Sequence, residues 1–294
     1  MKSFQRLMLI LVFLLLTGKI SYADHRLRVE FWPKTLKQGE VCLVRASSSA
    51  SFGTIHGEFR GKRFPMSLGA RQGSYEGLLG IDLDTGSGAY PLKVMGTDEA
   101  ERIYMRVFAL KVGKADFGSQ ALSLPSSMVD LDPQTMKRVE KEEARLKVLF
   151  QGHRKEKIWK GPFARPVPGG CSTAFGLRRV INGQRKSPHT GVDLRAEEGA
   201  SILASNDGIV VLVDHLFFSG KSVILDHGWG TYSMYFHLSE PLVGEGERVK
   251  KGAVLGRVGS TGRSKGPHLH WGIRINGARV DPFALLGLTE HLRE

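Results

Sequence analysis

The sequence predicts a mainly β protein with an N-terminal immunoglobulin-like β-sandwich, a connecting helix and a C-terminal antiparallel β-sheet domain. Three observations predict this fold class. Short alternating segments fill much of residues 27–112, a charged stretch with helical spacing follows Asp132, and the chain beyond residue 161 is dense in glycine and β-branched residues. With 294 residues, 41% of them hydrophobic, the chain can form two domains with ordinary cores.

Residues 1–23 have the pattern of a secretory signal peptide. Lys2 and Arg6 precede the apolar run Leu7 to Leu16, and a small-residue cleavage site ends at Ala23. The run is shorter than the roughly 20 residues that a membrane-spanning helix needs, and no later run is long enough. We therefore expect an exported protein, periplasmic or cell-wall associated, with no stable membrane insertion after signal cleavage.

Residues 24–113 are predicted to form the sandwich. Apolar residues alternate with polar ones in short runs such as Leu27, Val29 and Phe31, and glycine- and aspartate-rich turns such as Asp82 to Gly88 separate the runs. A period of two indicates strands, and this spacing of turns is typical of an immunoglobulin-like sandwich. No catalytic group of residues is found in this region.

Residues 130–158 are predicted to form the connecting helix. Asp132 followed by Pro133 has the pattern of a helix N-cap and first turn. Apolar residues then recur at helical spacing through a stretch of alternating charge, which is most simply a solvated helix face: Met136, Val139, Leu146 and Leu149.

Residues 161–290 are predicted to form the second domain. Strand-like runs at 209–213, 222–225 and 232–237 are separated by turns, and Asn182-Gly183 indicates a hairpin. Closely spaced strands without intervening helices favour an antiparallel sheet over a βαβ fold. Almost no helix is expected before Asp281.

The net charge is +13, or about +10 without the three basic residues of the signal peptide. A basic exported protein is attracted to polyanions, and cell walls supply these as peptide carboxylates. No nucleic-acid-binding motif is found, so nucleic acid is not an expected partner. Cys42 and Cys171 are expected to be buried thiols rather than a disulfide, although their spacing does not exclude pairing.

One pair of potential metal ligands is His189 and Asp193, in the segment His-Thr-Gly-Val-Asp. Pro188 and Gly191 make a helix improbable, so a loop that leads into a strand must aim the two side chains. Alone, such a pair occurs by chance in many proteins.

A stronger signal is His268-Leu269-His270, which leads into an alternating run. Residues two apart on a strand face the same way, so both imidazoles point into one site while Leu269 faces the other side. Two histidines on one face bury poorly without partners, so a purely structural pair is unattractive.

The third element is His237, at the end of the run Tyr232 to His237. Alternation places Ser233, Tyr235 and His237 on one side and the apolar residues Tyr232, Met234 and Phe236 on the other. This leaves His237 free to face a cleft. Other histidines, such as His56, His215 and His227, are isolated and expected to be structural or exposed.

In their order along the chain, with His237 between the other two, the three elements resemble the lysostaphin and LytM (β-lytic) type of zinc metallopeptidase. The HxxxD motif matches His189 to Asp193, the HxH motif matches His268 to His270, and Tyr235-Phe236-His237-Leu238-Ser239 matches the intervening histidine. The resemblance spans about residues 166–282. It implies a LytM-type peptidase domain in which His189, Asp193 and His270 hold one Zn²⁺ while His237 and His268 are catalytic.

The resemblance implies a peptidoglycan endopeptidase that cuts peptide cross-links or stem peptides. Two imidazoles and one carboxylate leave a coordination position open for water, as in catalytic zinc sites. The two other histidines would handle proton transfer and oxyanion stabilisation, in an order left open. Two alternatives are a noncatalytic LytM-like activator of a cell-wall amidase and a general exported protease.

The first 160 residues suggest two further roles. The sandwich and the helix either position the enzyme on the cell wall or cover its cleft until a regulatory protein partner removes them. The second role is a hypothesis motivated by a complete lytic site in an exported protein. The bond that is cleaved stays open.

Overall fold

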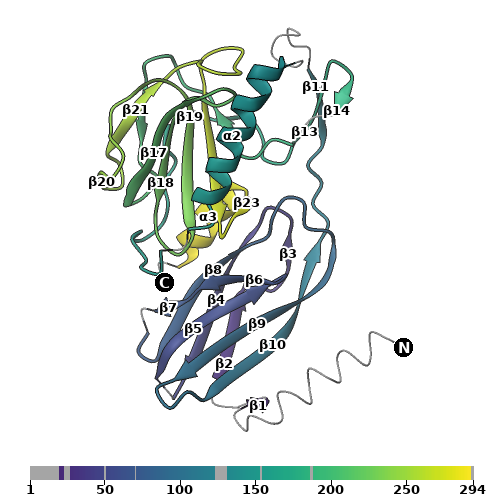
Figure 1. Ribbon diagram of the computed structural model, residues 1–294, viewed down its shortest axis with the longest axis vertical. Helices are drawn as coiled ribbons and strands as arrows, with labels where there is room; N and C mark the ends of the chain where they lie inside the picture. Colours follow the sequence, from purple (N-terminus) through teal and green to yellow (C-terminus); the bar gives the residue numbers. More distant parts are fainter. Residues whose placement is uncertain are drawn as a thin grey trace.

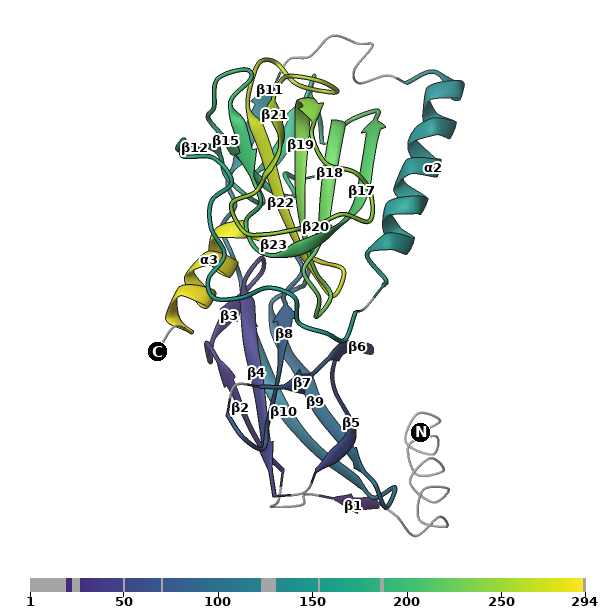
Figure 2. The same cartoon turned by 90° about the vertical axis from the view of Figure 1, so that its left-hand side faces the viewer.

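The computed structural model describes residues 20–22, 27–49, 51–69, 71–122, 131–152, 154–185 and 188–292. Most of the predicted signal peptide, residues 1–19 and 23, lies outside the described residues. The described chain forms a β-sandwich and a second domain built on a large sheet, with the helix α2 beside that sheet (Figures 1 and 2). The prediction of a mainly β protein is therefore confirmed.

The N-terminal domain consists of two sheets packed face to face. One has the strand order β1-β10-β9-β5-β6 with β3 beside β10, and the other has the order β2-β4-β8-β7. A cluster of buried side chains that includes Leu27, Val44, Leu92 and Leu110 fills the space between them. The strands are Ile20–Tyr22 (β1), Leu27–Trp32 (β2), Leu36–Lys37 (β3), Val41–Ser48 (β4), Phe52–Phe59 (β5), Lys62–Pro65 (β6), Ser67–Leu68 (β7), Ser74–Gly80 (β8), Gly88–Asp98 (β9) and Ile103–Gly113 (β10). A β-sandwich is thus present, and its immunoglobulin-like topology stays a prediction.

The segment after the sandwich contributes to the second domain. Strand β11 (Ser119–Leu122) runs parallel to β13 (Arg178–Ile181), which forms a hairpin with β14 (Gln184–Arg185). Asn182 and Gly183 have φ values of 50° and 77°, and two positive φ angles at Asn-Gly are typical of a tight hairpin turn.

Helix α2 (Pro133–Leu149) begins as the sequence predicts, because the Asp132 carboxylate accepts hydrogen bonds from the backbone N–H groups of Gln134 and Thr135. It ends earlier than predicted. After Leu149 the Phe150 side chain is buried against the large sheet, and Lys157 forms a β-bridge with Gly228. This tertiary anchoring draws residues 154–158 away from the helix axis, so the prediction of a helix to residue 158 is wrong.

The second domain is built on a sheet of order β12-β15-β22-β19-β18-β17-β20, in which β23 pairs with β22 and β21 joins β16 to β19. Its core is formed by side chains such as Val192, Val223, Tyr235 and Trp271. The strands are Cys171–Thr173 (β12), Val192–Leu194 (β15), Ser201–Leu203 (β16), Gly208–Leu216 (β17), Gly220–Asp226 (β18), Thr231–Pro241 (β19), Arg248–Val249 (β20), Val254–Val258 (β21), Leu269–Ile275 (β22) and Ala278–Val280 (β23), and helix α3 is Pro282–His291. The pairings within this sheet are antiparallel, as predicted.

The two domains share one hydrophobic core. Val41, Leu43 and Leu78 of the sandwich belong to the same buried cluster as the core of the second domain. Arg279, which follows the turn after β22, donates hydrogen bonds to both Asp82 carboxylate oxygens at 2.7 and 3.0 Å. The sandwich is therefore fixed at the C-terminal end of β22.

Both cysteines are free thiols; Cys42 is buried, as expected, whereas Cys171 is exposed because it lies near the start of the edge strand β12. Within the described residues, no helix combines the length and apolar character needed to cross a bilayer.

Candidate active site

Two of the predicted metal-binding side chains lie on neighbouring strands. Asp193 in β15 and His270 in β22 are directly opposite each other in an antiparallel pair. Residues in such a pair project from the same face of the sheet, so the register alone brings the carboxylate and the imidazole together. The Asp193 Oδ1 and His270 Nδ1 atoms are 2.9 Å apart.

His189 reaches the same point from the loop that precedes β15. Its backbone is held at both ends, because its N–H bonds to the Leu177 carbonyl and its carbonyl accepts from the Gly176 N–H. Its ring Nδ1 lies 2.8 Å from the Ala174 carbonyl oxygen, which can only accept a hydrogen bond. Nδ1 is therefore the protonated nitrogen, and Nε2 points into the site.

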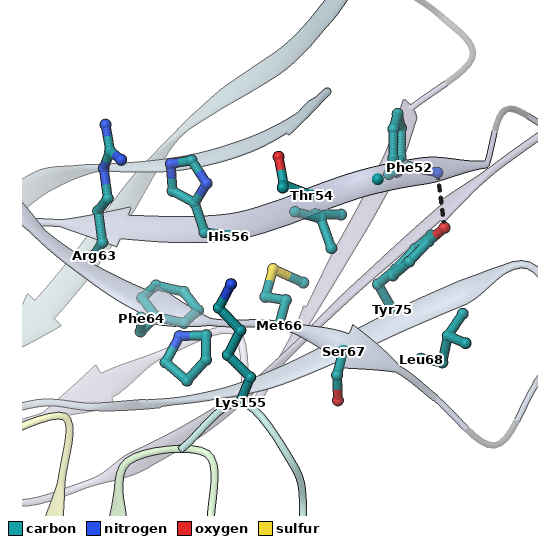
Figure 3. A pocket seen from close by; sticks show the side chains of 13 residues that line it. Phe52, Thr54, His56, Arg63, Phe64, Met66, Ser67, Leu68, Tyr75 and Lys155 are labelled. Atoms are coloured by element: carbon teal, nitrogen blue, oxygen red, sulfur yellow. Dashed lines mark hydrogen bonds between the residues drawn. The ribbon is translucent and has the colours of Figure 1, made fainter. Parts of the chain in front are cut away.

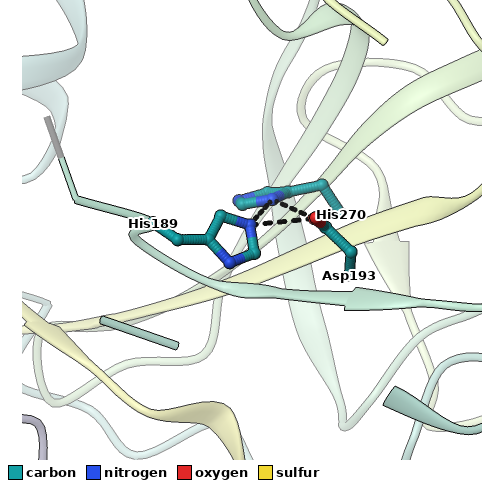
Figure 4. Close-up of side chains that lie close together, drawn as sticks. All are labelled: His189, Asp193 and His270. Carbon is teal, nitrogen blue, oxygen red and sulfur yellow. Dashed lines mark hydrogen bonds and ion pairs between the residues drawn. The ribbon is translucent and has the colours of Figure 1, made fainter. Parts of the chain in front are cut away.

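Three potential ligand atoms meet in a small triangle (Figure 4). His189 Nε2, Asp193 Oδ1 and His270 Nδ1 are each 2.9 Å from the other two, and all three residues are buried. With neutral imidazoles, lone pairs would converge at this spacing, and a cation among them would relieve their repulsion. The donor set of two imidazoles and one carboxylate fits a metal ion of the zinc type.

The environment of Asp193 favours its charged form. Burial by itself raises the pKa of the carboxyl group. When His189 and His270 carry protons on the ring nitrogens that face Asp193, their hydrogen bonds and charges outweigh burial and hold the pKa far below its usual range. An ionised carboxylate is the form that binds a metal ion.

His268 lies immediately before β22 and faces the same point. Its Nε2 is 3.7 Å from Asp193 Oδ1, and its Nδ1 is 2.9 Å from the Gly266 carbonyl oxygen. Leu269, between the two histidines, is fully buried in the core on the opposite face. The predicted geometry of His268 and His270 is thus present.

His237 reaches the site by a route that alternation does not predict. Between Tyr235 and Leu238, β19 carries one residue more than the facing stretch of β18, which marks a β-bulge, and His237 has φ = 66°. A bulge re-aims a side chain. The His237 ring centroid lies 4.9 Å from that of His268 and 6.1 Å from that of His270.

The prediction that Ser233, Tyr235 and His237 share a cleft face of β19 is therefore wrong for Ser233 and Tyr235. Ser233 and Tyr235, expected to share a cleft face with His237, are fully buried. The site instead lies on the face of Phe236, which pairs with His270 and stacks on its ring with centroids 5.5 Å apart. Strict alternation would turn His237 into the core, and only the bulge turns it toward the metal-binding side chains.

The immediate surroundings keep His237 neutral. Burial, followed by the charge of His270, lowers the pKa of His237 to about 3. Its Nδ1 lies 2.7 Å from the Thr261 carbonyl oxygen, so Nδ1 carries the proton and Nε2 is an available acceptor. The arrangement can bind a cation on one side and exchange protons with a bound molecule on the other.

Some contributors were missed in the sequence. The carbonyl groups of Ala174, Thr261 and Gly266 orient three imidazoles, but a backbone carbonyl leaves no signal in residue identity. The sequence predicts only that Phe236 lies on the apolar face, because its pairing with His270 depends on the register between β19 and β22. His227 is structural, as predicted, because both of its ring nitrogens are hydrogen-bonded, to the Asp207 carbonyl and to Ser233 Oγ.

Comparison with known proteins agrees with this geometry. Residues 187–282 match Peptidase family M23, and this range contains all five site residues. Over 106 residues the chain is 42% identical to the DD-carboxypeptidase/endopeptidase Mpg of Neisseria meningitidis serogroup B, covering 36% of this chain and 24% of that protein. Over 113 residues it is 40% identical to the peptidoglycan DD-endopeptidase ShyC of Vibrio cholerae, covering 38% and 26%. The chain thus matches about a quarter of the length of these relatives.

A solved structure extends the likeness to most of the chain. It is a crystal structure from Pseudomonas aeruginosa described as belonging to peptidase M23, 30% identical, with a TM-score of 0.63. The similarity covers 85% of this chain and 95% of that one, so it reaches well beyond the 187–282 segment into the first half of the sequence.

Proposed function

The chain belongs to peptidase family M23, and on that premise we propose that it is a zinc-dependent endopeptidase that hydrolyses peptide cross-links or stem peptides of peptidoglycan. The observation that carries the proposal is the triangle of His189, Asp193 and His270 atoms at 2.9 Å, with His189 oriented by the Ala174 carbonyl. The relatives named as peptidoglycan DD-endopeptidases support the substrate class.

His189, Asp193 and His270 would hold one Zn²⁺. When bound, zinc supplies Lewis-acid polarisation of a peptide carbonyl and activation of water. Burial of the three ligands excludes bulk water around them, and the Ala174 carbonyl fixes which nitrogen of His189 faces the ion.

His237 and His268 would serve as the catalytic pair. Each donates its Nδ1 proton to a backbone carbonyl and directs Nε2 into the site. A neutral Nε2 can accept a proton from an attacking water, and the imidazolium so formed can donate to the leaving amine or stabilise an oxyanion. Two such groups on one side of the metal-binding triangle suffice for both transfers, in either order.

Two alternative functions are considered beside the endopeptidase. A noncatalytic activator of a cell-wall amidase is disfavoured, because all three ligands and both histidines meet in one place. A general exported protease would use the same groups on proteins.

The test is digestion of purified peptidoglycan by the full-length chain, with and without chelator, together with zinc analysis. His270→Ala should lose both zinc and activity. His237→Ala and His268→Ala should keep about one zinc per chain and lose roughly 100-fold or more in rate, because proton transfer is removed while the ligands remain. His215→Ala, at an exposed histidine, is the matched control and should behave as the parent.

Each alternative has its own signature. Tight zinc binding without release of muropeptides would overturn the endopeptidase proposal and favour the activator. Equal cleavage of casein and peptidoglycan would favour the general protease. Mass spectrometry of the released fragments identifies the bond.

The proposal includes export to the periplasm or cell wall and a regulatory protein partner that acts on α2. Leu146 and Leu149 of α2, with Phe150 at its C-terminal end, pack in one cluster with Tyr232, Met234 and Phe236, the face of β19 that adjoins the site. Substrate and α2 therefore approach the same face of the sheet. The described part of the sandwich shares its core with the second domain, and Asn276, just after β22, bonds to the Leu78 carbonyl at the end of β22 opposite His270.

A further inference from the structure

A second cavity lies in the sandwich, between its two sheets. The chain crosses from β6, the edge of one sheet, to β7, the edge of the other, at Met66. The crossing leaves an open pocket of about 560 Å³ beside β5, β6 and β7 (Figure 3). This volume falls within the roughly 300–1,000 Å³ typical of ligand sites. We call it the sandwich pocket.

The sandwich pocket has apolar walls and a cationic rim. Phe64, Met66 and Tyr75 are buried walls, and Arg63 and Lys155 supply positive charge. Lys155 comes from the segment after α2 and extends between Phe64 and Met66 (Figure 3). Among the described residues that line the pocket, none is acidic.

The two cationic side chains of the pocket differ from their neighbours in forming no close ion pair. Nearby on the sandwich, Lys93 pairs with Glu58 at 2.8 Å and Arg45 pairs with Glu76 at 2.7 Å. Among the described residues, neither the Arg63 guanidinium nor the Lys155 ammonium forms an ion pair or a side-chain hydrogen bond. The carboxylate opposite Arg63, Glu58, is bonded to Lys93, although it still feels the charge of Arg63. Charge complementarity therefore favours an anionic ligand.

A polar group inside the pocket also lacks a partner. His56 Nε2 is buried and has no hydrogen-bond partner among the described residues. Burial, with the charge of Arg63, lowers the pKa of His56, so its imidazole is neutral and can serve as donor or acceptor. A ligand can supply the missing partner only if neighbouring side chains of the pocket move, because this nitrogen has almost no accessible surface.

The pocket does not favour simple addition of a strand to the sheet. The edge strand β6 ends in Pro65, which has no N–H to donate, and β7 has only two residues. A ligand must instead insert side chains.

We propose that the sandwich pocket binds an acidic peptide, with a carboxylate between Arg63 and Lys155 and an apolar side chain against Phe64 and Met66. The identification of this peptide as an uncleaved stem peptide of peptidoglycan rests on the proposed function. The pocket is then a substrate-holding site separate from the catalytic one.

The position of the pocket suits that role. Ser67, in its wall, accepts a hydrogen bond from Trp229 Nε1 at 2.6 Å, and Trp229 precedes β19. His237 lies six residues beyond Thr231, the first residue of β19, or about 20 Å along a strand. A polymer that presents many peptides can occupy both sites at once, which raises its effective concentration at the active site.

The test measures binding of two probes to the full-length chain carrying His268→Ala, so that probes are not cleaved. One probe is the mixture of muropeptides released from peptidoglycan by a muramidase, and the other is a synthetic peptide with two glutamates and a leucine. Each is also used with its carboxyl groups amidated. Arg63→Gln with Lys155→Gln should weaken binding of both acidic probes at least tenfold and leave the weak binding of amidated probes unchanged.

Lys62→Gln with Lys114→Gln is the matched control, because it removes two exposed charges of the same region outside the pocket. It should change binding less than twofold, and Arg63→Lys with Lys155→Arg should restore it. Equal losses in the pocket variant and the control, or equal binding of amidated probes, would overturn the inference.

A second measurement, hydrolysis of soluble substrate, separates a failure of the pocket proposal from a failure of the proposed function. Hydrolysis of soluble cross-linked muropeptides by chains with intact His268 should be the same with and without the pocket substitutions. Absence of hydrolysis in both would sink the proposed function while leaving the binding result intact. Intact hydrolysis with no pocket-dependent binding would sink only the present inference.

Discussion

Backbone carbonyls determine which ring nitrogen each site histidine presents. His189, His237 and His268 all place Nδ1 within 2.9 Å of a carbonyl oxygen and leave Nε2 for the site. His227 has both nitrogens occupied, by a carbonyl and by a hydroxyl, and has none left for chemistry. The second ring nitrogen therefore distinguishes these histidines: that of His227 bonds to a neutral hydroxyl, whereas that of His189 faces Asp193 and His270.

His227 predicts a pH dependence of stability. Burial lowers its pKa from 6.5 to about 4. Between these values the unfolded chain binds a proton that the folded chain does not, so stability falls as the pH drops from 6.5 toward 4. At pH 5 the loss is about 2 kcal/mol. Urea unfolding of His227→Gln at pH 7 and pH 5 should show a drop smaller by about this amount than in the parent.

The other groups near His227 cancel in this comparison. Asp207, Asp226 and Tyr235 are present in both proteins and contribute equally. His215→Gln removes an exposed histidine and should leave the parent's drop unchanged. An identical drop in the parent and in His227→Gln would contradict the assignment.

At the scale of elements, two irregular features shape the site. The bulge in β19 turns His237 out of the core, and α2 lies on the sheet face beside the site. Arg145 holds α2 to the second domain, because it bonds to Asp214 of β17 at 2.5 Å and to Glu245 at 3.5 Å. The inner side of α2 is apolar. The helix is therefore held to the sheet both by the ion pairs of Arg145 and by apolar packing.

Arg145→Glu tests the regulatory role of α2. The substitution places a negative charge beside Asp214 and Glu245, and like charges should loosen the helix from the sheet. We expect a several-fold faster digestion of peptidoglycan at low ionic strength, with the difference shrinking as salt screens the repulsion. Lys147→Glu makes the same charge change at an exposed position of the helix and should leave the rate unaltered. Equal rates for both variants would argue against control by α2.

At the scale of the whole molecule, the shared core makes the two domains one cooperative unit. Leu78 and Val41 of the sandwich pack into the core of the second domain, and Asn276 donates a hydrogen bond to the Leu78 carbonyl at 2.8 Å. We expect tryptophan fluorescence and far-ultraviolet circular dichroism to report the same single unfolding transition.

Arg279→Leu should weaken this junction. The Arg279 hydrogen bonds outweigh burial and lower the pKa of Asp82, so their removal leaves a half-buried carboxylate without its partner. We expect a loss of about 2 kcal/mol in the free energy of unfolding, measured in urea. Lys250→Gln removes the exposed pair with Asp207 and should cost less than about 1 kcal/mol. Similar losses for both would show that the Arg279 pair contributes no more than a surface contact.

Features that depend only on neighbouring residues could be predicted from the amino-acid sequence. Asp132 and Pro133 begin α2 because capping is local. His268 and His270 both face Asp193 because they stand two residues apart at the start of β22. The order of the motifs along the chain was enough to predict that His189 and Asp193 belong to the same site as His270. The sandwich was predictable from period-two patterns, although its finer topology was not.

Features that depend on contacts between distant residues could be recognised only in the folded chain. The bulge at His237 arises from the register of β19 with β18, and the end of α2 is set by burial of Phe150. The common core at Val41 and Leu78, and the pocket where Lys155 meets Phe64, join segments far apart in the chain. Spacing along a sequence carries no record of such contacts, because they form only when separate strands choose their register and pack.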